Sequence, residues 1–131
     1  MPRKTDSNNP GDWLWIASSD LAGVQVLVAQ EVAYEMARSK LAEILEKVLK
    51  AELLRLGWFL QKTHDLERLL DALIERKSDL VSIIEPLCDS LSEAYFVTRY
   101  PGFDMDDPNW PDLNVVANQV AALLSTVQSR L

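Results

Sequence analysis

Apolar residues recur every three or four positions along almost the whole chain, and this period constrains the fold more than any other feature. The clearest stripe lies near the C-terminus and consists of Leu113, Val116, Ala117, Val120, Leu123, Leu124 and Val127. Such spacing places apolar side chains on one face of an α-helix. No stretch alternates apolar and polar residues over the length of a strand. We therefore predict an all-α protein.

The same period predicts five helices, at about residues 12–30, 32–57, 64–77, 79–99 and 113–131. Asp12 is the expected N-cap of the first helix, and Gly57 suits the left-handed position that ends the second. Pro86 should kink the fourth helix or mark a late start, because proline removes a donor and clashes inside a helix. The expected architecture is an antiparallel up-and-down bundle of four to five helices.

A chain of 131 residues matches the size of one domain. We expect a flexible tail over residues 1–11 and a single domain over 12–131. No apolar run approaches the roughly 20 residues that cross a bilayer, and the first residues lack the apolar centre of a signal peptide. We therefore expect a cytoplasmic protein that does not contact membranes. Residues 102–110 are expected to be mobile, with Phe103 and Trp110 folding back as a lid.

The net charge of −7 argues against a protein that coats duplex DNA by neutralising phosphates. The charge is uneven, because residues 1–77 carry 11 Lys and Arg against 12 Asp and Glu, whereas residues 78–131 carry 2 against 8. Arg99 and Arg130 are the only cations of that acidic part. Arg99 therefore needs an explanation.

Several kinds of chemistry are excluded or unsupported. The glycines at 11, 23, 57 and 102 cannot form a phosphate-cradling loop. Asp104 and Asp106 have the spacing of a calcium loop, but Pro108 replaces the next ligand. Cys88 and His64 fall on separate helices, so a small buried Cys88 is the better interpretation. We expect no cofactor, no metal and no catalytic residue.

Two polar groups remain as candidates. Glu43 and Lys47, like Glu46 and Lys50, form i,i+4 pairs in the favourable order, and a solvated helix face explains them most simply. Thr63, His64 and Asp65 stand at a helix start, where they either cap the helix or form part of a site.

Arg99 and Tyr100 precede Pro101 at the expected end of the fourth helix. Arg99 complements the helix dipole there, or fastens the bundle by pairing with a carboxylate such as Asp65. Alternatively, its planar guanidinium binds a phosphate or carboxylate while Tyr100 stacks on a base.

Four segments in order, "DWLWIASSDL", "EKVLKAELLRLG", "KTHDLERLLDAL" and "YFVTRYPG", resemble the HEPN domain family. The resemblance covers about residues 12–131. It implies a four- or five-helix bundle, usually dimeric and often encoded beside a minimal nucleotidyltransferase in toxin–antitoxin-like pairs. It also implies a ligand site that joins the start of the third helix to the end of the fourth, with Arg99, Tyr100, His64, Asp65, Lys47 and Lys50 as its candidate residues.

Ribonuclease members of this family carry an Arg followed, after four to six residues, by a His. The only histidine here is His64, and the positions that would need the Arg hold Gly57, Trp58 and Phe59. A non-catalytic nucleotide- or RNA-associated module with a nucleotidyltransferase partner is therefore the first functional hypothesis. A dimerisation or interaction protein without a ligand is the second, and a ribonuclease is the third. We also expect a homodimer, because wide apolar stripes that include Trp13, Trp15 and Trp58 exceed what one small bundle covers.

Overall fold

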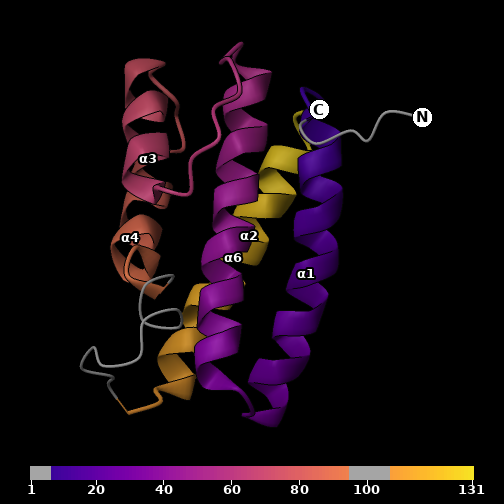
Figure 1. The fold of residues 1–131 in the computed structure, drawn as a ribbon, viewed down its shortest axis with the longest axis vertical. Coiled ribbons are helices and arrows are strands. Elements are labelled where there is room, and N and C mark those ends of the chain that lie inside the picture. The colour runs from indigo at the N-terminus through magenta and orange to yellow at the C-terminus, as the bar shows by residue number, and fades with distance from the viewer. Residues whose placement is uncertain (1–6, 95–106) are drawn as a thin grey trace.

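The computed structural model describes residues 7–94 and 107–131, which form five α-helices and no strand. The helices are α1 (Pro10–Gln30), α2 (Tyr34–Arg55), α3 (Leu66–Glu75), α4 (Val81–Leu91) and α6 (Trp110–Gln128). Figure 1 shows α1 and α2 side by side in opposite directions, with α3 and α4 on the flank of α2 away from α1 and α6 behind α2. The predicted all-α bundle is confirmed.

Capping residues set the ends of α1 and α2, and one of the two differs from expectation. Asn9 rather than Asp12 caps α1, its side chain accepting a hydrogen bond from the Gly11 backbone N–H at 2.9 Å, with Pro10 at the first helical position. Gly57 has the expected positive φ of 88° after α2. Pro86 lies inside α4, which begins five residues earlier, so a late start at this proline was wrong.

The core forms where the apolar stripes meet around α2, which packs against α1, α3, α4 and α6. Every residue of the predicted α6 stripe is buried, and so are Leu66, Leu69, Leu70 and Leu73 of α3. Removing one such leucine from water contributes about 2 kcal/mol. Because α2 is enclosed by its neighbours, even its polar residues are drawn into the interior, and this positions the candidate site.

Residues 57–65 leave the end of α2 and return along it before α3 begins (Figure 1). This extended return makes α3 run in the same direction as α2. Within the described residues, no helix is both long and apolar enough to span a membrane.

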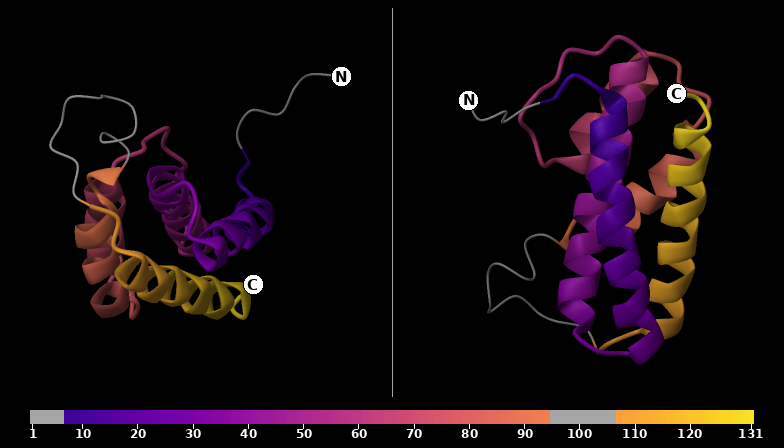
Figure 2. Two further views of the ribbon diagram at one scale, coloured as in Figure 1. Left: turned by 90° about the horizontal axis from the view of Figure 1, so that it is seen from below. Right: turned by 90° about the vertical axis from the view of Figure 1, so that its right-hand side faces the viewer.

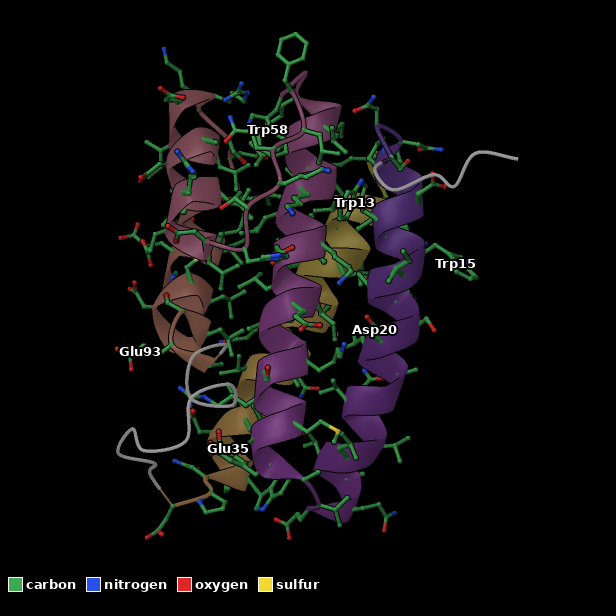
Figure 3. All side chains as sticks on the ribbon, viewed as in Figure 1. Trp13, Trp15, Asp20, Glu35, Trp58 and Glu93 are labelled. Carbon is green, nitrogen blue, oxygen red and sulfur yellow. The ribbon has the colours of Figure 1, made fainter. Side chains whose placement is uncertain are left out.

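Three tryptophans that were expected at the surface, Trp13, Trp58 and Trp110, are packed into the bundle to different degrees. Trp58 is buried and Trp13 is half-buried, so of the tryptophans in the predicted stripes only Trp15 is exposed, pointing away from the bundle in Figure 3. Trp110 belongs to the first turn of α6 and packs edge-on against Tyr34, with ring centroids 5.2 Å apart. It is part of the folded bundle rather than a mobile lid. Phe103 lies outside the described residues.

Candidate functional site

The central helix α2 carries three buried ionisable side chains. Glu46, Lys50 and Glu52 expose only 7%, 4% and 1% of their surface. A buried charge without a partner costs several kcal/mol, so each must be paired. The two buried carboxylates, Glu46 and Glu52, differ in the residues that pair with them.

Glu46 is shared by two nitrogen groups. Its Oε1 lies 2.9 Å from His64 Nδ1, and its Oε2 accepts a hydrogen bond from Lys50 Nζ at 3.1 Å. Lys50 Nζ also stands over the ring of Trp13, 5.2 Å from its centroid, in cation–π geometry. We call these four residues the Glu46 cluster. The cluster links the start of α1, the middle of α2 and the return segment.

The burial of this cluster overturns one expectation from the sequence. Glu46 and Lys50 do pair, but the pair is enclosed rather than on a solvated helix face. Glu43 pairs with Lys40 at 2.7 Å instead of with Lys47. Lys47 is half-buried, and no ion pair of its side chain is found among residues 7–94 and 107–131. Of the two expected i,i+4 pairs, only Glu46–Lys50 forms. It is buried because that side of α2 faces α1 and the return segment, residues 57–65.

The three polar residues before α3, Thr63, His64 and Asp65, have different roles. Asp65 caps α3 by accepting from the Glu67 backbone N–H at 3.0 Å, and Thr63 Oγ1 accepts from the Asp65 backbone N–H at 3.2 Å. His64 takes no part in this cap, since its ring turns to Glu46. Its side chain is 69% exposed, so it is the surface end of an otherwise buried cluster.

A carboxylate bonded to Nδ1 fixes the orientation and the tautomer of an imidazole, because Nδ1–H donates to it. The cavity between the cluster and the end of α4 measures only about 10 Å3, which admits no more than a single water molecule. A ligand larger than water must therefore meet this cluster at the exposed edge of His64.

Arg99 and Tyr100 lie outside the described residues, so their part in a site stays a prediction. The same holds for Asp104 and Asp106. Within the described ranges, no group of His, Cys, Asp and Glu side chains is arranged to hold a metal ion. Cys88 is fully buried, and this burial raises the pKa of its thiol to about 12, which suits a core residue and not a nucleophile.

Sequence reasoning missed the second buried carboxylate, Glu52. It accepts hydrogen bonds from Arg55 Nε at 3.0 Å and from Arg130 Nη1 at 3.4 Å. Arg130 also binds Asp79 with two bonds of 2.8 Å. These bonds hold the pKa of the Asp79 carboxyl below its usual value and raise the pKa of Arg130. The network ties the end of α6 to α2 and to the segment before α4.

A signal for this network was present in the sequence. Arg130 follows the α6 stripe by three positions from Val127, which places it beside the buried face of that helix. A lone cation at the edge of an apolar stripe needs an acidic partner on a neighbouring helix.

Comparison with known proteins gives one match. The sequence profile of the HEPN domain family matches residues 11–127, almost the whole chain. No curated protein and no solved structure matched the chain. Together with the all-helical bundle, the match over this span identifies the chain as a member of the HEPN domain family.

Proposed function

We propose that this chain is a non-catalytic HEPN protein that binds a nucleotide or RNA in the cytoplasm and acts with a minimal nucleotidyltransferase in a toxin–antitoxin-like pair. Membership in the HEPN family supports the coarser part, a nucleotide- or RNA-associated helical module. The nucleotidyltransferase partner is inferred from how such domains are commonly encoded.

The observation that carries a ligand site is the bond between Glu46 and His64. A buried carboxylate orients an imidazole that is itself mostly exposed, and Lys50 balances the charge of that carboxylate. An oriented ring at the surface is the part of this cluster that a phosphate or a base can contact. Arg99, Tyr100, Asp65 and Lys47 complete the proposed contacts.

The segment before His64 supports the proposal that the chain is not catalytic. An RNA-cleaving site needs a proton-transfer group and a cation that stabilises the phosphate. At the required spacing, Gly57 closes α2, Trp58 packs into the core and Phe59 is apolar and exposed. None of the three supplies a cation.

The test is titration calorimetry of the full chain with ATP, GTP and a short single-stranded RNA. We expect at least one to bind, and His64→Ala to abolish the heat. Lys77→Ala is the matched control, because Lys77 is exposed and lies at the far end of α3. Retained binding by His64→Ala would remove the site, and metal-independent RNA cleavage lost in that variant would make the chain a ribonuclease.

A second candidate function is an interaction protein without a ligand, and the small cavity favours it. Room for a single water beside the Glu46 cluster suits a structural role as well as a shallow binding edge. Absence of heat with all three titrants, together with a stable complex with a nucleotidyltransferase encoded beside it, would select this candidate.

A further inference from the structure

The end of α1 and the start of α6 border a hollow that the proposed ligand site does not use. Both helix ends lie at the same end of the bundle (Figure 2, right), and the two helices pack against each other. The hollow measures about 410 Å3. This volume falls within the roughly 300–1,000 Å3 of small-molecule sites, whereas the cavity beside the Glu46 cluster admits a single water molecule at most.

The described lining of the hollow combines an aromatic ring, neutral amides and one carboxylate. Trp110 supplies the ring, against which Tyr34 packs edge-on with the centroids 5.2 Å apart. Gln25, Asn114 and Asn118 supply the amides, and the other lining residues of both helices are apolar. The carboxylate belongs to the residue that ends α1.

This residue is Glu31, and its position in the fold is unfavourable in two ways. It is the C-cap of α1 in the left-handed conformation, with φ 53° and ψ 50°, where glycine or asparagine is the residue with least strain. Its carboxylate also lies at the C-terminal end of a helix of 21 residues, where the helix dipole disfavours negative charge. A glutamate here therefore lowers the stability of the fold.

Contacts within the described chain do not explain this glutamate. Glu31 is exposed, and within residues 7–94 and 107–131 no hydrogen bond or ion pair of its side chain is found. Asp112, which follows Pro111 of the lining, is different, because it stands in the first turn of α6, where the dipole favours a carboxylate. The fold thus gives a reason for Asp112 and none for Glu31.

We propose that the hollow binds a small aliphatic amine, whose ammonium group pairs with Glu31. A positive charge is favoured both by this carboxylate and by the C-terminal end of the α1 dipole. The indole ring of Trp110 attracts cations, and amide oxygens accept hydrogen bonds from N–H groups. The apolar part of the lining covers the methylene groups of such a ligand.

The lining disfavours an anion and a metal ion. No Lys or Arg is found among its described residues, so a phosphate would face Glu31 without a balancing cation. Calcium takes six to eight oxygen ligands, of which several are usually carboxylates, and the described lining offers one carboxylate. The hollow therefore differs in chemistry from the nucleotide or RNA site proposed at His64.

The amides favour a free diamine over a lysine side chain of a partner protein. Asn114 and Asn118 are four positions apart and so lie on the same face of α6. Their oxygens provide acceptors for a second amino group, which the single ammonium of a lysine side chain does not supply.

Heteronuclear NMR of the full chain, titrated with putrescine, tests the proposal. We expect shifts of the side-chain amide signals of Asn114 and Asn118 and of the indole N–H signal of Trp110, which is assigned by its loss in Trp110→Phe. The indole signal of Trp15, which is 75% exposed on α1, should not move. Butanediol, which has the same length without charge, should shift none of these signals.

The matched variants are Glu31→Gln and Glu75→Gln. Glu31→Gln removes the charge at nearly constant size and should weaken putrescine binding by at least roughly tenfold. Glu75→Gln, at a side chain 80% exposed on α3, should bind as the wild type does. Thermal unfolding separates loss of the site from loss of the fold, because Glu31→Gln should melt at the same temperature as the wild type or higher.

Three results would overturn the proposal: no shift with putrescine, equal shifts with butanediol, or unchanged binding by Glu31→Gln. A short lysine peptide with blocked ends that binds more tightly than putrescine would overturn the assignment to a free amine. None of these results bears on ligand binding at His64, because this inference does not rest on the proposed function.

Discussion

Glu46 and Glu52 are both buried on α2, less than two helical turns apart, yet their surroundings differ in kind. Glu52 is held by two arginines, whose charge is permanent and whose side chains reach solvent at the ends of α2 and α6. Glu46 is held by an enclosed lysine and by a histidine that opens to the surface.

This difference distinguishes a network that fastens the fold from the cluster that we propose as a ligand site. The arginines of the Glu52 network join chain segments and lead to another carboxylate, Asp79, so every charge there is used within the fold. The Glu46 cluster instead ends in the imidazole of His64, whose side chain is 69% exposed. Solvent therefore reaches the Glu46 cluster through the His64 ring.

Glu46→Ala should have the largest effect on stability, lowering the free energy of unfolding by about 3 kcal/mol. The change leaves the Lys50 ammonium enclosed and, among the described residues, with the Trp13 ring as the remaining contact of its charge. Urea unfolding of the wild type and of Glu46→Ala measures the effect. The double variant Glu46→Ala/Lys50→Met should recover most of the lost free energy of unfolding, because it also removes the unpaired ammonium. A double variant as unstable as the single one would show that Lys50 is not the reason.

Glu52→Ala should cost less, about 2 kcal/mol, although Glu52 is the more deeply buried carboxylate. Its arginines keep 30% and 26% of their side chains exposed, so water replaces part of what they lose, and Arg130 retains Asp79. Glu75→Ala, at a side chain 80% exposed, is the matched control and should change little. A cost above that of Glu46→Ala in the same urea series would reverse the comparison.

The contrast between the carboxylates lay beyond the sequence for a physical reason. Apolar periodicity predicted the helices and their buried stripes, because burial of leucine and valine repeats with the helical turn. The same rule placed Glu46 and Lys50 in solvent, since helix-surface pairs are usually exposed. Their burial depends on Trp13 and on the path of residues 57–65, which no local pattern determines.

The candidate site was predicted in part. The polar segment before α3 drew attention to His64 and Asp65, and the structure shows that only Asp65 acts as the cap. The bond of His64 to Glu46 joins residues 18 positions apart, and a tertiary contact of this length has no signature in one sequence.

His64→Ala should lower the free energy of unfolding by less than about 1 kcal/mol, because the ring is mostly exposed and Glu46 keeps Lys50 as its partner. Thermal and urea unfolding measure this directly. A loss as large as that of Glu46→Ala would mean that the histidine fastens the fold, and the contrast with the Glu52 network would disappear.

The smallest effect concerns Asp79, the exposed end of the Glu52 network, and it should appear as a dependence on pH. Hydrogen bonds from Arg130 lower the pKa of Asp79 in the folded chain, so the folded state favours the ionised carboxylate. The resulting stabilisation is present above the unfolded pKa, near 3.9, and is lost as the pH falls through the lower folded value.

The wild type should therefore melt at a slightly higher temperature than Asp79→Asn at neutral pH, and the two melting temperatures should converge as the pH is lowered below about 4. Asp89→Asn, at an exposed position of α4, serves as the control and should lack this convergence. A constant difference between wild type and Asp79→Asn over the whole range would show that the pair with Arg130 stabilises through its shape and not through its charge.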